Sequence, residues 1–131
     1  LFPEIAAACV RQGADVLVNI TNDAWYLHSA AAEQHFQASV FRAVETRRYL
    51  ARSANTGVSG FVDPYGRQRE VVRSVSGDWI FGQGMARLSV SKPAAGMTFY
   101  TRHGDVFVAL CLVIALGSLY RRSVPCAPPR P

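Results

Sequence analysis

The residues best suited to chemistry form a loop that begins at Asn22. Asn22 and Asp23 directly follow a short run of β-branched residues that is typical of a buried strand. Polar side chains at the carboxyl end of such a strand lie where open α/β sheets bind ligands. The loop continues with Trp25, Tyr26 and Leu27, whose large apolar bodies are suited to a pocket or to lipid. We therefore predict that Asn22, Asp23, Trp25 and Tyr26 bind substrate.

A structural role for the same loop is the alternative. Asn22 and Asp23 are residue types that form turns and cap the next segment, and Trp25 is large enough to cover the core. The sequence alone leaves both interpretations open.

Three further polar residues are predicted to be structural and to lie near the site. Glu45 lies three residues after Arg42 and three before Arg48, a spacing that pairs charges along a helix, with a catalytic carboxylate as the alternative. His35 is predicted to be a surface or partly buried helical residue, with a ligand role as the alternative. Asn55 precedes a Thr-Gly pair that interrupts a strand, as a bulge or a close backbone approach would.

The reactive side chains form no complete catalytic set. Cys9 falls on the apolar stripe of a predicted helix, Cys111 lies inside an apolar run, and Cys126 lies in a proline-rich tail. Their spacing is not that of a metal site, and their odd number gives no disulfide framework. Lys92, the only lysine, precedes a proline near the apolar run. We predict no metal and no cofactor.

The net charge of +5 comes almost entirely from arginine, because Lys92 is the only lysine among 14 basic residues. The arginines are dispersed through predicted helices, strands and tail, with no basic stripe interleaved with aromatic residues. We therefore predict no nucleic-acid partner.

The order of the predicted elements is that of an α/β protein. A helix is expected from Pro3 to Gly13, a buried strand over 15–20, and a long helix over 30–49. Short strands are expected over 50–54, 58–62, 69–72 and 80–90, with a hairpin turn at 63–66. On the long helix, the core face is predicted to carry Phe36, Val40 and Val44, and the opposite face Glu33, Gln37 and Arg48.

Residues 106–120 contain no charged side chain. Fifteen helical residues reach only about 22 Å, short of a hydrocarbon core of about 30 Å, so a buried core helix is the alternative. Phe99 and Tyr100 can extend one end, and Arg121 and Arg122 can snorkel at the other. We therefore predict one transmembrane helix within a linker and helix segment, residues 98–122. Arg130 adds to the positive charge after the span, which predicts a cytoplasmic C-terminus.

Several blocks of the chain resemble successive segments of apolipoprotein N-acyltransferases, a branch of the carbon–nitrogen hydrolase (nitrilase) superfamily. The resemblance rests on Asn22-Asp23-Ala24-Trp25, Gln34-His35-Phe36, Arg42-Ala43-Val44-Glu45, Arg47-Arg48-Tyr49, Asn55-Thr56-Gly57, Asp63-Pro64-Tyr65-Gly66 and residues 98–105. It covers nearly the whole chain except the proline-rich tail.

This resemblance implies an α-β-β-α sandwich domain on the periplasmic side of the bacterial inner membrane. In such enzymes a Glu–Lys–Cys triad takes an acyl chain from a phospholipid as a thioester. The acyl group then passes to the free amino group of the S-diacylglyceryl cysteine of an apolipoprotein. The implied partners are therefore a phospholipid donor, an apolipoprotein acceptor and the membrane, and the implied full-length enzyme is a monomer without a cofactor.

Phe2-Pro3 matches the end of the family's nucleophile motif, Cys-Tyr-Glu followed shortly by Phe-Pro. We therefore interpret the chain as a C-terminal fragment that lacks the triad and is inactive alone. The resemblance places Trp25 near the lipid-accessible mouth of the site. The family commonly has Phe-Gly after this Trp, whereas Tyr26-Leu27 stand here, so the flexibility of the family's loop does not carry over.

The predicted fold class is thus the C-terminal half of a nitrilase-type sandwich (residues 1–97), followed by one transmembrane helix (within 98–122) and a disordered tail (123–131). Two rival functions stay open: a fragment of a soluble carbon–nitrogen hydrolase (amidase), and a non-catalytic, membrane-anchored truncation product.

Overall fold

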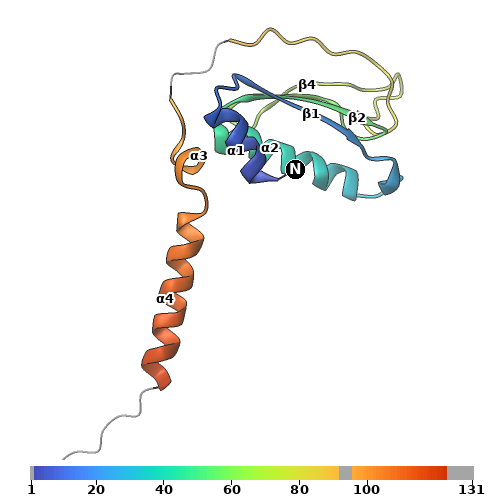
Figure 1. Ribbon diagram of the computed structural model, residues 1–131. Helices are drawn as coiled ribbons and strands as arrows, with labels where there is room; N and C mark the ends of the chain where they lie inside the picture. Colours follow the sequence, from blue (N-terminus) through green and yellow to red (C-terminus); the bar gives the residue numbers. More distant parts are fainter. Residues whose placement is uncertain (1, 92–95, 124–131) are drawn as a thin grey trace, which may run out of the picture.

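A computed structural model describes residues 2–91 and 96–123 of the 131-residue chain. The elements are α1 (Pro3–Arg11), β1 (Val16–Asn22), a short 3₁₀ helix η1 (Ala24–Tyr26), α2 (Ala31–Thr46), β2 (Tyr49–Asn55), β3 (Gly60–Val62), β4 (Gln68–Val71), α3 (Phe99–His103) and α4 (Val106–Ser123). Helices α1 and α2 lie on one face of a four-stranded sheet (Figure 1). The predicted α/β class is therefore confirmed.

The sheet has the order β1-β2-β3-β4. Strands β1 and β2 are parallel, and α2 makes the crossover between them; their last residues, Asn22 and Asn55, pair with each other. Strands β2, β3 and β4 are antiparallel, and the turn after Val62 joins β3 to β4, as the sequence predicted. The parallel pair matters for function because it places the ends of β1 and β2 at the same edge of the sheet.

The core lies between the sheet and its two helices. Its buried side chains come from both helices, from β1, β2 and β3, and from the segment between β2 and β3: Ala6, Val10, Leu17, Phe36, Ala43, Leu50, Val58 and Val62. Phe36 is buried and Val40 packs against the cluster, which confirms that face of α2. Arg48 was predicted on the opposite, exposed face of a helix extending to residue 49. That prediction was wrong, because Arg47 adopts a left-handed conformation (φ 53°), α2 ends at Thr46, and Arg48 turns inward.

The other face of the sheet is largely open. Val18 and Ile20 of β1 point away from the helices and are exposed. The segment after β4 crosses over this face (Figure 1). A strand was predicted over 80–90, but the structure has no strand there. Gly82 and Gly84 lower the strand propensity of this segment, and it runs over the sheet instead of pairing with an edge strand.

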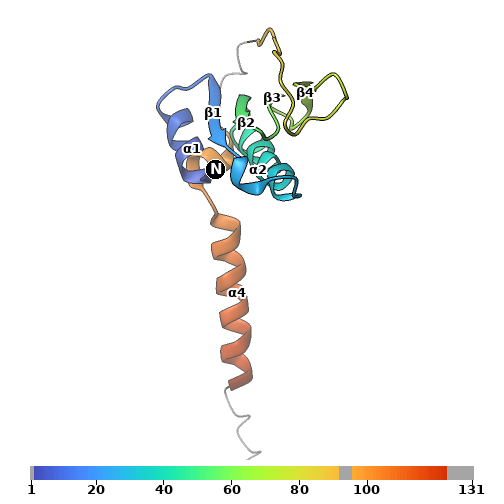
Figure 2. The same cartoon turned by 90° about the vertical axis from the view of Figure 1, so that its right-hand side faces the viewer.

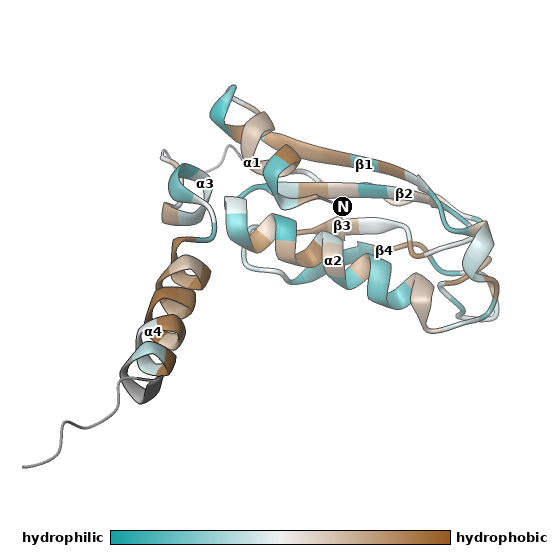
Figure 3. Ribbon diagram, turned by 60° about the horizontal axis from the view of Figure 1, so that its bottom comes forward, coloured by the Kyte–Doolittle hydropathy of each residue, from teal (hydrophilic) through white to brown (hydrophobic). Residues whose placement is uncertain are grey.

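Helix α4 projects away from the sheet and its covering helices (Figures 1 and 2). Most of its apolar side chains up to Tyr120 are exposed, and they make it the most hydrophobic part of the ribbon (Figure 3). Phe99 and Tyr100 were predicted to extend this helix; they belong instead to α3, because the chain reverses at Gly104 (φ 66°).

The predicted transmembrane helix is not supported. Within residues 2–91 and 96–123, no helix combines the length and the apolarity that crossing a bilayer requires. Helix α4 has 18 residues, which corresponds to about 27 Å of rise. Lys92, Cys126 and the tail predicted to be disordered, apart from Ser123, lie outside the described residues.

Candidate functional site

The polar residues that end β1 and β2 meet at one edge of the sheet. The Asp23 amide donates to the carbonyl of Asn55 (3.1 Å), and the Asn55 side-chain amide donates to Asn22 Oδ1 (3.3 Å). Asn22 Oδ1 also accepts from the backbone amide of Ala24 (3.1 Å), which forms the turn that leads into η1. The structure thus brings together Asn22, Asp23 and Asn55, three of the predicted site residues, and Asn22 also forms a turn.

Asp23 is buried beneath the loop, with only 1% of its surface exposed. Arg52 Nη2 donates to Asp23 Oδ2 (2.8 Å), and both side chains are fully buried. His35 Nδ1 lies 2.8 Å from Asp23 Oδ1, so its N–H donates to the carboxylate. A substrate-binding role was predicted for Asp23; in the structure its side chain lies buried beneath the loop and takes part in these two contacts. His35 is the partly buried helical residue that was predicted.

Arg52, which the sequence analysis did not identify, is the centre of this network. Besides Asp23, its guanidinium donates to Ser39 Oγ on α2 (2.8 Å), to Asn19 Oδ1 on β1 and to the carbonyl of Val58 (3.2 Å). Only 3% of the residue is exposed. The signal was present in the sequence, because Arg52 is two residues from the core residue Leu50, and residues two apart share one face of a strand.

Gly57 permits the close approach of the next segment to Asp23. A Cβ atom at this position would lie 2.1 Å from Asp23 Oδ2. A side chain here would therefore occupy the space of the buried carboxylate. The interruption predicted at Asn55-Thr56-Gly57 is a close backbone approach of this kind.

The tip of the loop is exposed above this buried base. Trp25 is 85% exposed and Leu27 is 67% exposed, while Tyr26 is partly covered. The edge of the Tyr26 ring contacts His35, with 5.8 Å between ring centroids. The alternative that Trp25 covers the core is therefore wrong, and the loop presents a large apolar surface at the carboxyl end of β1.

The backbone of the tip is strained at Leu27, which has φ 47° and ψ −139°. Few residues other than glycine adopt this conformation. The next residue, His28, stacks on Phe81 with 4.4 Å between ring centroids, and the Phe81 amide donates to the Thr56 carbonyl (2.8 Å). The segment after β4 therefore holds the far side of the loop in place.

Glu45 lies away from this loop, at the opposite end of α2. Ten residues of helix separate it from His35, which corresponds to about 15 Å. It pairs with Arg42 (2.7 Å), as predicted, whereas Arg48 donates to the backbone carbonyls of Ala14 and Arg47 instead. Burial raises the pKa of the Glu45 carboxyl above its usual value, although the charge and hydrogen bond of Arg42 act in the opposite direction.

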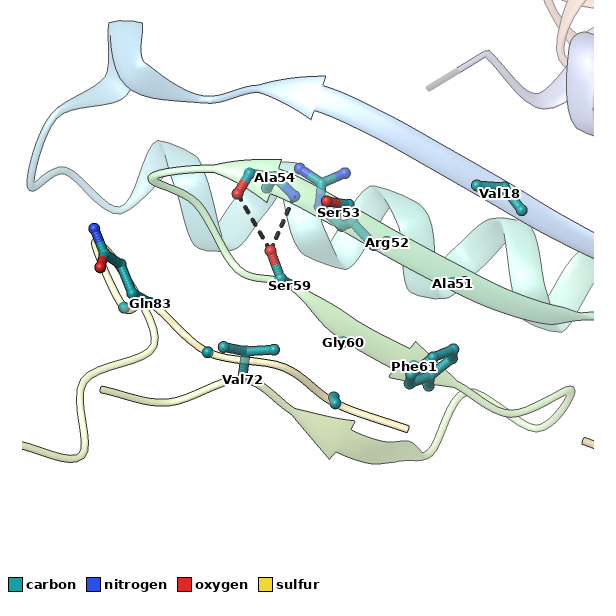
Figure 4. A pocket seen from close by; sticks show the side chains of 13 residues that line it. Val18, Ala51, Arg52, Ser53, Ala54, Ser59, Gly60, Phe61, Val72 and Gln83 are labelled. Carbon is teal, nitrogen blue, oxygen red and sulfur yellow. Dashed lines mark hydrogen bonds between the residues drawn. The ribbon is translucent and has the colours of Figure 1, made fainter. Parts of the chain in front are cut away.

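A cavity of about 500 Å³ lies on the open face of the sheet, between β2, β3 and the segment 82–86 (Figure 4). Val18, Phe61 and Val72 supply its apolar wall, and Ser59 Oγ is occupied by hydrogen bonds to the backbone of Ala54. Its polar lining has no arrangement of nucleophile and base. The cavity is therefore an incompletely covered sheet face rather than a reaction centre.

The described part of the chain supplies no nucleophile paired with a base. Cys9 on α1 and Cys111 on α4 are both free and exposed. Across residues 2–91 and 96–123, no group of histidine, cysteine and carboxylate side chains is placed to hold a metal ion. What the site offers is an exposed aromatic loop on a buried polar base.

Comparison with known proteins gives this arrangement a context. The sequence profile of the family described as "Carbon-nitrogen hydrolase" matches residues 1–70. The chain is 38% identical to an apolipoprotein N-acyltransferase of Thermotoga maritima over 91% of its own length, and 40% identical to one of Geobacter metallireducens over 95%. It is 42% identical over 90% of its length to one of Gloeobacter violaceus. The chain spans only 22%, 23% and 21% of these three relatives.

Proposed function

Because the chain belongs to the carbon–nitrogen hydrolase family, we propose that it is the C-terminal part of an apolipoprotein N-acyltransferase. The intact enzyme would move an acyl chain from a phospholipid to the amino group of the N-terminal cysteine of an apolipoprotein. The observation that carries this proposal is the exposed Trp25 loop, fixed on a buried ionic base at the carboxyl end of two parallel strands.

The chemistry of the loop fits these substrates. Trp25 and Leu27 offer exposed apolar area for an acyl chain. Asn22 beside them, whose Oδ1 already accepts two hydrogen bonds, offers its side-chain NH₂ as a donor for the polar end of a lipid or a peptide. Tyr26 lies between the apolar tip and the polar base of the loop, and the edge of its ring contacts His35. The loop therefore serves as the rim of a binding site whose nucleophile lies elsewhere in the intact enzyme.

Helix α4 is the part of the chain that we propose contacts the membrane. Its exposed apolar side chains include Phe107, Val113 and Leu116, and they have no protein partner in the described structure. An apolar surface of this kind is stable when lipid covers it. The proposal places the α/β domain (residues 1–97) on the periplasmic side of the inner membrane, with the apolar surface of α4 against the lipid.

The test is acyl transfer by the full-length protein that contains this chain. Vesicles would supply a phospholipid with a labelled acyl chain, and a diacylglyceryl-cysteine peptide would be the acceptor. Replacing Trp25 with alanine should raise KM about tenfold, because a truncated aromatic anchor typically costs 1–2 kcal/mol of binding. Tyr65, an exposed aromatic residue in the β3–β4 turn, provides the matched control, and Tyr65→Ala should change KM less than about twofold.

Equal KM values for wild type, Trp25→Ala and Tyr65→Ala would contradict a substrate-binding role for the loop. The family match also favours a second candidate function, hydrolysis of an amide. Release of ammonia from simple amides, without acyl transfer to the peptide, would support that function instead.

A further inference from the structure

Resting on the proposed function, we propose that Arg52 is a positioning residue for the acyl-transfer site. It touches no substrate. It holds Asp23, and through Asp23 it holds the Trp25 loop in the orientation that binds the acyl chain. The role is carried by geometry, since one buried guanidinium joins the loop to three other parts of the domain.

The contacts of Arg52 reach β1, α2 and the segment before β3 as well as the base of the loop. Its side chain donates to Asn19 on β1, to Ser39 on α2, to the Val58 carbonyl before β3 and to Asp23 at the base of the loop. A guanidinium has its donors in a fixed planar fork, so these bonds determine the direction of the Asp23 carboxylate as well as its position.

Asp23 transmits this constraint to the exposed tip. Its backbone carbonyl accepts from the amide of Tyr26 (3.0 Å), which closes the turn of η1, and its own amide donates to Asn55. Trp25 therefore lies inside a short turn whose first residue is fixed by a buried ion pair. Because Trp25 itself is 85% exposed, packing of its own side chain does little to fix it.

Stability alone does not require an ion pair at this place. Replacing a buried pair with well-packed apolar residues is often neutral or stabilising, whereas hydrogen-bonded charges fix one geometry. The chain also contains a natural control. Arg48 is 8% exposed and donates to the carbonyls of Ala14 and Arg47, yet it has no contact with the loop.

The experiment compares Arg52→Ala with Arg48→Ala in the full-length protein that contains this chain. Hydrogen exchange measured by mass spectrometry should show that Arg52→Ala speeds exchange of amides 23–29 about tenfold, with little change in α3. Arg48→Ala should leave amides 23–29 unchanged. In the acyl-transfer assay, Arg52→Ala should raise KM about tenfold and change kcat less than about threefold, and millimolar guanidinium should restore KM.

If Arg52→Ala does not accumulate as folded protein, Arg52→Lys keeps the charge but loses the fork and should give smaller changes of the same kind. Equal exchange at amides 23–29 in the Arg52 and Arg48 variants would overturn the proposal, as would an unchanged KM. If the wild-type protein transfers no acyl group, the proposed function fails while the exchange data still decide the role of Arg52.

Discussion

An arginine–carboxylate pair lies near each end of α2, but the two pairs differ in how many of their carboxylate oxygens have hydrogen-bond partners. At the loop end, both oxygens of Asp23 have partners, in Arg52 and His35. At the other end, which we call the α3 joint, Arg42 binds one oxygen of Glu45. Among the described residues, no hydrogen-bond donor reaches the other buried oxygen, Oε2.

This difference shows which end is built to hold one geometry. A fully satisfied buried network specifies a single arrangement, whereas a partly satisfied one is sensitive to its environment. At the α3 joint, Thr98 and Thr101 both approach the carbonyl of Glu45, so α3 is fastened mainly through backbone and hydroxyl groups. We expect the loop end to be rigid and the α3 joint to respond to pH.

The largest expected effect is at the loop end. Gly57→Ala places a methyl group where the Asp23 carboxylate lies, and that carboxylate must move away from Arg52. Breaking a buried ion pair costs about 3–5 kcal/mol of unfolding free energy. Urea denaturation of the full-length protein measures this loss.

Gly117→Ala is the matched control, because a Cβ atom at Gly117 on α4 meets nothing within 4 Å. That variant should be neutral or slightly stabilising, since alanine favours a helix by up to about 1 kcal/mol over glycine. A Gly57→Ala variant as stable as Gly117→Ala would break the contrast between a rigid loop end and a softer joint.

The second prediction concerns the α3 joint. Thr98 caps α3 by accepting from the Thr101 amide (3.0 Å), and its hydroxyl donates to the Glu45 carbonyl. Thr98→Ala should cost about 1–2 kcal/mol, the usual loss for an N-cap. The expected result is faster hydrogen exchange in α3 than in wild type, with no change in the exchange of the Trp25 loop. Thr98→Ser retains the hydroxyl and should behave as wild type; equal exchange in the two variants would refute the capping role.

Much of the fold follows from the sequence because local signals agree there. Pro3 marks the start of α1, the β-branched run before Asn22 forms β1, and the Pro-Gly turn joins β3 to β4. The errors have tertiary causes. The long helix ends early because Arg47 takes a left-handed conformation that no local rule requires. The strand predicted over 80–90 fails because Gly82 and Gly84 lower its strand propensity and the segment packs over the open face of the sheet.

The residue types of the site could be predicted from the sequence, but which of them are buried and which are exposed could not. Asn22, Asp23, His35 and Asn55 do come together, whereas Glu45 is at the far end of α2. The sequence predicted that Asp23 binds substrate together with Trp25, with a turn-forming role as the alternative, because the depth of adjacent loop residues cannot be read from a linear pattern. Only the three-dimensional contact with Arg52, 29 residues away, shows that Asp23 is buried.

The third prediction tests whether the loop end stores strain. Leu27 has φ 47°, a conformation that favours glycine, and its side chain is exposed, so little packing is lost on removing it. Leu27→Gly should raise the unfolding free energy by about 1 kcal/mol, the usual cost of a left-handed conformation for a residue with a Cβ atom. Leu27→Ala keeps the Cβ atom and should give no gain. Equal thermal stabilities of the two variants would show that the tip is unstrained.

The smallest effect expected is a pH dependence at the α3 joint. Burial raises the pKa of Glu45 in the folded protein above its value of about 4.3 in an unfolded chain. The folded state therefore binds the proton more tightly, and the contribution of Glu45 to stability is present below that pH and declines as pH rises through the folded pKa.

Glu45→Gln removes the titrating group, so the stability of wild type relative to this variant should fall as pH rises above about 4.3. Urea denaturation at several pH values measures the difference, and Glu70→Gln, at an exposed carboxylate on β4, is the control. Parallel pH profiles of unfolding free energy for wild type and Glu45→Gln would show that Glu45 adds no pH dependence to stability. The two ends of α2 would then differ in geometry alone.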